Sequence, residues 1–235
     1  MLTSGLPFLS IVAALGASFA WLVFYLHEDE HPEPKRLVLA VFAGGMAVTP
    51  IALLLECGWW QLLGGACGTA TAPSFFAFTG FAFIEEVLKF SVVALGVSRS
   101  REFDEPVDAM MYLIVSALGF AAVENFFFLW APFGQSVGFG IQVAGLRFVG
   151  ATLLHVLTSA VLGYFFALGL IMRERTMLLI ALGLGLATLL HALFNSLILI
   201  NSRVSLVLLG VLLISLILIV AAYLARLKRI AGRAA

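Results

Sequence analysis

Charged side chains are scarce in this chain. Of its 235 residues, 13 are Lys or Arg and 13 are Asp or Glu, so only 11% are charged, against about 25% in ordinary soluble domains. The two signs cancel, and a formal net charge of zero leaves no overall field that would attract nucleic acid or an acidic polymer. We therefore expect no nucleic-acid partner, and any binding specificity must come from local sites.

Cysteine is rare as well. The two cysteines, Cys57 and Cys67, form no CxxC pair, which excludes both a disulfide-rich scaffold and a CxxC metal or redox site. Both lie in the stretch 56–74, between two long apolar runs. An oxidising compartment would permit a bridge between them, and the alternative of two unpaired thiols stays open.

Apolar residues, in contrast, are abundant. They make up 63% of the chain, where soluble domains have about 45–50%. A run of about 20 such residues crosses the hydrocarbon core of a bilayer as a helix, and no linker here is long enough to separate domains. We expect an all-α, polytopic helix bundle in the cell membrane, one domain over 1–235, with a Gly-rich loop at 131–146. The seven expected spans cover residues 7–26, 37–55, 75–97, 107–130, 147–172, 177–200 and 204–225.

The basic residues predict the orientation of the bundle, because cytoplasmic loops are enriched in Lys and Arg. Alternate polar breaks lie on the same side of the membrane. One side holds only Arg147 and Arg203, so the N-terminus is expected outside and the C-terminus in the cytoplasm. The other side holds ten basic residues: Lys35, Arg36, Arg99, Arg101, Arg173, Arg175, Arg226, Lys228, Arg229 and Arg233.

The expected span 75–97 carries Glu85, Glu86 and Lys89 near its middle. An ionisable side chain at the centre of a membrane helix costs about 2.5–3.5 kcal/mol, so each one calls for a partner or a purpose. Lys89 lies three and four positions after the two glutamates, on one helical face. A structural ion pair accounts for one Glu and the Lys, while two carboxylates beside one cation also suit acid–base chemistry.

Three other expected spans carry polar residues at a similar depth. They contribute Glu124, then His155, and then His191 with Asn195 one helical turn later. By a rise of about 1.5 Å per residue, Glu85 lies roughly 15 Å from the outer end of its span, Glu124 roughly 9, His155 roughly 12 and His191 roughly 14 Å. These groups could therefore meet in one layer in the outer half of the membrane.

Four motifs on four expected spans follow one another in the sequence. They are EEVLK (85–89), FAAVEN (120–125), His155 followed by Gly163 and Tyr164, and HALFN (191–195). In this order they resemble the PrsW-type intramembrane proteases, which are grouped with CAAX-type prenyl proteases in a broader superfamily. The resemblance covers about residues 30–200. It implies proteolysis of a membrane-anchored substrate, typified by first-step cleavage of an anti-sigma factor.

Two mechanisms fit these residues. In the first, Glu124, His155 and His191 bind a catalytic zinc with an open position for water. Glu85 or Glu86 is the base, and Asn195 donates a hydrogen bond to the oxyanion or to a zinc ligand. The broader superfamily has histidine where Glu124 stands, and no HExxH motif is present. In the second, no metal is used: Glu85 and Glu124 position the water, while His191 and Asn195 form the oxyanion hole. In the first mechanism, Lys89 holds one member of the Glu pair ionised.

Two functions from other classes remain open. Glu, His and Lys inside a helix bundle also form the proton relays of transporters, although neither inverted repeats nor matching broken helices are found in the sequence. A scaffold subunit could use the same polar groups only to join its helices. The scaffold predicts that Glu85→Gln and His191→Ala impair folding, whereas the protease predicts a folded but inactive Glu85→Gln variant.

Overall fold

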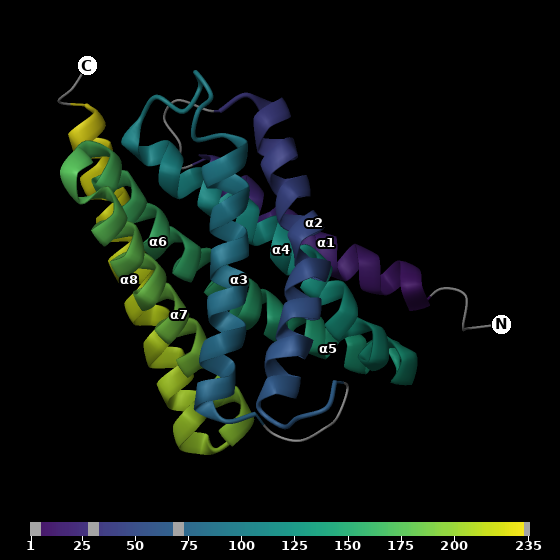
Figure 1. Ribbon diagram of the computed structural model, residues 1–235. Helices are drawn as coiled ribbons and strands as arrows, with labels where there is room; N and C mark the ends of the chain where they lie inside the picture. The colour runs from purple at the N-terminus through teal and green to yellow at the C-terminus, as the bar shows by residue number, and fades with distance from the viewer. Residues whose placement is uncertain (1–5, 28–32, 68–72, 233–235) are drawn as a thin grey trace.

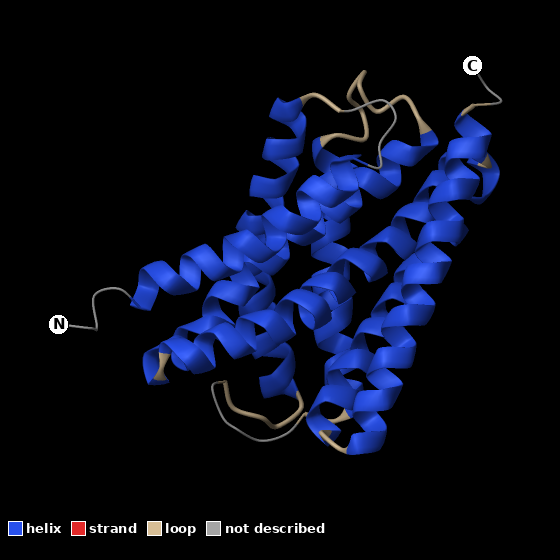
Figure 2. Cartoon of the chain, turned by 180° about the vertical axis from the view of Figure 1, so that it is seen from behind, coloured by secondary structure: helices blue, strands red, loops and turns tan. Residues whose placement is uncertain are grey.

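The computed structural model describes residues 6–27, 33–67 and 73–232, and within these ranges the chain is helical and contains no strand. Figures 1 and 2 show the helices as one bundle, with the C-terminus at the end opposite the α7–α8 junction. The α-helices are α1 (Leu6–His27), α2 (Lys35–Leu62), α3 (Phe75–Gly96), α4 (Pro106–Gln135), α5 (Val137–Arg147), α6 (Leu153–Ile171), α7 (Thr176–Ile200) and α8 (Arg203–Ala231); a π-helical turn, η1 (Phe148–Thr152), precedes α6, and a 3₁₀ turn, η2 (Arg173–Arg175), precedes α7.

Local sequence signals start several of these helices. Ser74 caps α3 by accepting a hydrogen bond from the amide of Ala77, and Ser136 and Ser202 cap α5 and α8 in the same way. At the start of α4 the side chain of Asp108 accepts hydrogen bonds from the amides of Asp104 and Glu105. Such caps satisfy amide groups that the first helical turn leaves without a partner.

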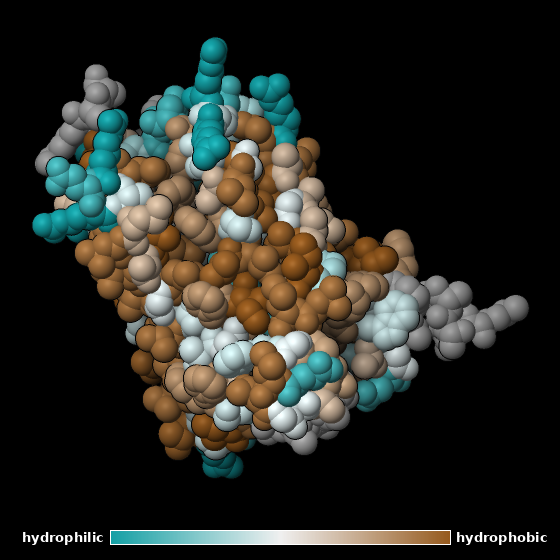
Figure 3. Space-filling model, viewed as in Figure 1, coloured by the Kyte–Doolittle hydropathy of each residue, from teal (hydrophilic) through white to brown (hydrophobic). Residues whose placement is uncertain are grey.

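The helices have the dimensions and surface of a membrane bundle, as predicted. Among the described residues, six segments are long and apolar enough to cross a membrane, with α5, η1 and α6 counted together as one. The 22 residues of α3 would extend about 33 Å, but this helix carries the three charged residues of the EEVLK motif. Figure 3 shows a broad apolar belt, with hydrophilic side chains gathered mainly at the end that holds the C-terminus.

The loop predicted over 131–146 is wrong. In the structure α4 continues to Gln135, and α5 begins two residues later, after the extended Ser136. Each glycine in a helix costs about 1 kcal/mol relative to alanine. The loop was predicted because this stretch is rich in glycine. Gly140 shows what offsets the cost: the ring of Phe133 occupies the space where a Cβ would stand, so the absent side chain lets the two helices pack closely.

Helices α4 and α6 form the centre of the bundle, because most of their side chains are buried. Helices α1 and α2 pack on α4, α7 and α8 pack on α6, and α3 lies between α2 and α7. Where α2 crosses α4, a Cβ on Gly45 would collide with the carbonyl oxygen of Ser116. The close crossing therefore requires glycine on α2, and it brings the backbones of the two helices together.

Cys57 and Cys67 form a disulfide, with their Cα atoms 5.4 Å apart. Cys57 lies on the last turns of α2 rather than in a loop, because this helix continues to Leu62. Of the two alternatives that the sequence left open, the structure thus has the bridged one. The bridge ties the residues that follow α2 to the end of that helix.

Candidate active site

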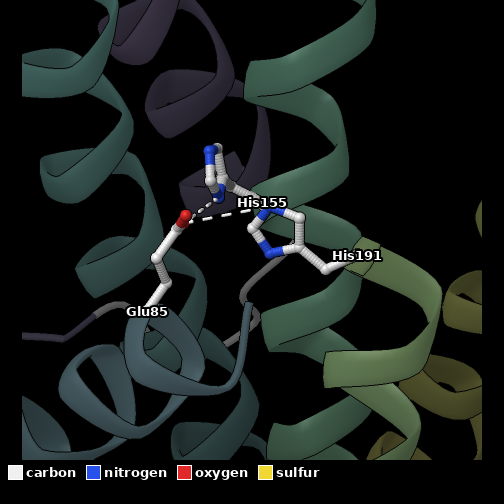
Figure 4. A group of neighbouring side chains, drawn as sticks. All are labelled: Glu85, His155 and His191. Carbon is white, nitrogen blue, oxygen red and sulfur yellow. Dashed lines mark ion pairs between the residues drawn. The ribbon is translucent and has the colours of Figure 1, made fainter. Parts of the chain in front are cut away.

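Three buried side chains from three helices point toward one another near the centre of the bundle (Figure 4). Oε2 of Glu85 on α3 lies 3.7 Å from Nδ1 of His155 on α6 and 3.9 Å from Nε2 of His191 on α7. The two imidazole rings contact each other edge to face, with centroids 4.9 Å apart. Helical periodicity puts each residue on the inward face of its helix, so residues that are 106 positions apart in sequence (85 and 191) meet in space.

The atom at the centre of this group, Oε2 of Glu85, is buried and has no hydrogen-bond partner among the described residues. Glu85 as a whole is 5% exposed. A buried carboxylate oxygen without a hydrogen bond is costly to maintain. Such an atom is explained when it faces a ligand, a water or a cation.

The partners of His155 determine which of its nitrogens carries the proton. Nε2 lies 3.1 Å from Oε2 of Glu124, and an ionised carboxylate can only accept a hydrogen bond. Nδ1 lies 3.1 Å from Nζ of Lys89, and an ammonium group can only donate. Both contacts assign the proton to Nε2, so Nδ1 is an acceptor that receives the hydrogen bond of Lys89, on the side of the ring that faces Glu85.

The same reasoning assigns the proton of His191, but here Nδ1 is the donor and Nε2 the acceptor. Its Nδ1 donates to Oε1 of Glu86 at 3.0 Å, which leaves the lone pair of Nε2 directed at Glu85. Glu86 also accepts hydrogen bonds from Lys89, Thr158 and Ser159. Because every one of these groups is buried, Glu86 is fully occupied in holding Lys89 and His191 in place.

The three acceptor atoms have the character of a metal-binding group. Among the described residues, Glu85, His155 and His191 offer ligand atoms that all lie within 4.8 Å of one another. Ligands at about 2.0–2.1 Å from a tetrahedral zinc ion are separated by about 3.3 Å, a few tenths of an ångström less than the two distances to Glu85. Each histidine also donates its other N–H to a carboxylate, the usual support of a metal-bound imidazole.

Lys89 competes with a metal for the same space. Its Nζ lies 3.1 Å from Nδ1 of His155, 4.0 Å from Oε2 of Glu85 and 2.6 Å from Oε1 of Glu86. The ammonium group thus neutralises part of the negative charge that would attract a cation. A metal bound between Glu85 and the two histidines requires Lys89 to move away from His155 and keep its pair with Glu86.

The predicted metal ligands were Glu124, His155 and His191, and the structure groups the histidines with Glu85 instead. Glu124 faces the Nε2 side of His155, opposite Glu85. It also forms an ion pair with Arg147. The predicted Asn195 lies one turn beyond His191 and is half-buried, and its side chain makes no hydrogen bond within the described chain.

A family model described as "PrsW family intramembrane metalloprotease" matches residues 33–224, most of the chain. The chain belongs to the PrsW family. All the residues of the site lie within the matched region, including the glutamate pair and both histidines.

Three curated PrsW proteases illustrate the similarity. The chain is 33% identical over 144 residues to Protease PrsW of Geobacillus kaustophilus, a match that covers 61% of this chain but only 58% of the relative. It is 30% identical to the Bacillus subtilis protein, with 67% of each chain covered. It is 26% identical to the Shouchella clausii protein, with 77% of this chain and 79% of the relative covered. No solved structure matches the chain.

Two residues of this PrsW site escaped sequence reasoning. Arg147 was counted as a loop charge, but it reaches Glu124. Glu56 was assigned to a polar break, but it lies on α2, where a charge on it would act on Glu85 and Glu124. Glu56 follows Thr49 by seven positions, on the face that packs against Phe120 of α4, and that periodicity was the available signal.

Proposed function

We propose that this PrsW family protein is an intramembrane protease that hydrolyses a peptide bond of a membrane-anchored protein. Its reaction centre is bounded by Oε2 of Glu85, Nδ1 of His155 and Nε2 of His191. The observation that carries the proposal is that these three acceptor atoms lie close together. One of them, the buried Oε2 of Glu85, has no hydrogen bond in the described chain. Three acceptors facing one another need a cation or a donor between them.

A divalent metal such as zinc suits this centre, with Glu85, His155 and His191 as its ligands. When bound, it would lower the pKa of a water molecule and polarise the substrate carbonyl. In this arrangement Glu124 and Glu86 are not ligands. They orient the two imidazoles by accepting their remaining N–H groups, at 3.1 and 3.0 Å.

The second candidate mechanism is metal-free and resembles that of the CAAX-type superfamily, to which we propose that the chain is related. Here Glu85 takes the proton of the attacking water directly. The position of Lys89 favours this candidate, because its ammonium group already lies beside His155 and Glu85. In both mechanisms Asn195 has amide hydrogens available for the developing oxyanion.

The proposed orientation puts the N-terminus outside and the centre in the outer half of the membrane. Two independent features support it: the ten-to-two distribution of basic residues, and the disulfide at the end of α2, since such bonds persist in oxidising compartments. Glu85 lies ten residues into α3 and His191 nine residues before the end of α7, which is about 15 and 14 Å of helix. We accordingly propose cleavage at the extracytoplasmic side of a single-span substrate, such as an anti-sigma factor.

The test compares cleavage by the wild type and by Glu85→Gln in proteoliposomes that contain a single-span membrane protein. We expect the variant to fold and to lose about 10²–10⁴-fold in rate, the usual contribution of a catalytic acid or base. Glu102→Gln, at an exposed cytoplasmic position, is the matched control. Equal cleavage by Glu85→Gln and wild type refutes the assignment, and a variant that unfolds supports the scaffold function instead.

A further inference from the structure

Arg147 is the residue of the site that the mechanism above has not used. It is the last residue of α5, and its side chain is only 14% exposed. One nitrogen of its guanidinium group, Nη2, donates to Oε2 of Glu124, and another, Nε, donates to Oδ1 of Asn125. The group also stacks on the ring of Phe128, 4.2 Å from its centroid. Three side chains of α4 thus hold one arginine.

The π-helical turn explains how Arg147 and His155 both reach Glu124. In an uninterrupted α-helix, residues eight positions apart point about 80° away from each other. A π turn accommodates one extra residue, and this reduces the angle to about 20°. The π turn lies between the two residues, at Phe148–Thr152. Its last residue, Thr152, accepts a hydrogen bond of 2.8 Å from Asn125, which fixes the turn against α4.

The same oxygen of Glu124 therefore accepts two hydrogen bonds, one from Arg147 and one from Nε2 of His155. A guanidinium group is permanently charged and planar, so it donates to a carboxylate in a fixed direction and orients it. A Glu124 side chain fixed in this way accepts from Nε2 and keeps the proton of His155 on that nitrogen. Nδ1 consequently remains an acceptor on the side that faces Glu85, where the proposed reaction takes place.

We propose that Arg147 is a positioning residue that acts on the reaction through Glu124 and His155. The inference rests on the proposed proteolytic function, and it holds whether the centre binds a metal or water alone. Without the guanidinium group, the Glu124 side chain is free to turn away. Of the two contacts that assign the His155 proton to Nε2, the one with Lys89 then remains, and we expect the other tautomer to gain population. Only one of the two tautomers presents Nδ1 as an acceptor.

The test is a double-mutant cycle of Arg147→Ala and Glu124→Gln in the cleavage assay, with Arg203→Ala as an exposed arginine control on the same side. Groups that orient a catalytic or metal-bound histidine typically contribute about 10–100-fold. We expect each single variant to lower kcat by that factor with little change in KM. The double variant should be no slower than the slower single variant, because both substitutions remove the same arrangement. Losses that multiply overturn the inference.

Two further readouts separate positioning from a structural role. Adding methylguanidinium should restore part of the activity of Arg147→Ala but none of that of Glu124→Gln, whereas a packing defect would not respond. ¹⁵N NMR of labelled histidine should show His155 protonated at Nε2 in the wild type and a mixture of tautomers in Arg147→Ala. A wild-type tautomer and wild-type kcat in Arg147→Ala contradict the proposal. If Glu85→Gln retains full activity, the proposed function itself fails, and that result is distinct from either outcome of the cycle.

Discussion

Lys89 offers a stringent test of the packing inside the site. Its side chain is fully buried, and its Nζ lies 2.6 Å from Glu86, 3.1 Å from His155 and 5.1 Å from the centroid of Phe120. Replacing Lys89 with methionine keeps the volume but removes the only cation beside Glu86 that the described residues supply. The carboxylate of Glu86 then stays buried without an opposite charge.

The size of the effect follows from what remains around Glu86. Removing one partner of a buried ion pair costs about 3–5 kcal/mol. Glu86 would still accept hydrogen bonds from Thr158, Ser159 and His191, so we expect a loss at the lower end, about 3 kcal/mol. Changing both partners, in Glu86→Gln with Lys89→Met, should restore about 2 kcal/mol, because no uncompensated charge is left.

The assay is reversible unfolding in mixed micelles, in which the detergent sodium dodecyl sulfate is increased and helicity is followed by circular dichroism. Lys35→Met, at an exposed position on the first turn of α2, is the control and should change the unfolding free energy by less than about 0.5 kcal/mol. A Lys89→Met variant as stable as this control would refute the reasoning. A double variant less stable than Lys89→Met would refute it too.

Three shorter predictions concern other parts of the molecule. Cys57→Ser removes the disulfide, which spans a separation of 10 residues, and should lower the unfolding free energy by about 3 kcal/mol. A thiol assay of the denatured wild type should detect two thiols after reduction and none before it. Gly45→Leu should prevent the bundle from packing, because any Cβ collides with the carbonyl of Ser116; a variant that purifies with wild-type stability would show that the crossing can widen. The metal-bound mechanism predicts that wild-type protein purified in detergent holds about one equivalent of a transition metal and that His191→Ala holds less than about a tenth. Less than a tenth in the wild type rules out this mechanism and leaves the metal-free one.

The membrane bundle and the meeting of the motifs could be predicted from sequence for one physical reason. A bilayer fixes the length of an apolar span, and ionisable groups inside it are too costly to occur without partners. Glu85, Glu124, His155 and His191 could therefore be assigned to one layer from helix rise alone. In the structure Glu85 lies beside both histidines, and Glu124 contacts His155.

The sequence could not assign the roles within that layer, because helix rise gives depth but not the rotation of a helix about its axis. Glu124 and Glu85 both fall in the layer of His155 but approach it from opposite nitrogens. The path of the chain near Arg147 was hidden as well. The glycines of residues 131–146 indicated a loop. In the structure most of this stretch is helical, and the π turn after Arg147 lets the arginine reach Glu124.

The most direct test of the account is to map the cleaved bond. The wild-type protein in proteoliposomes would cleave a single-span substrate in water labelled with oxygen-18, and mass spectrometry would locate the labelled new C-terminus. The proposed orientation, with Glu85 about 15 Å from the outer end of α3, predicts a labelled terminus on the extracytoplasmic side of the substrate's span, and none with Glu85→Gln. A labelled terminus in the cytoplasmic half, or the same product from Glu85→Gln, would contradict the proposed centre.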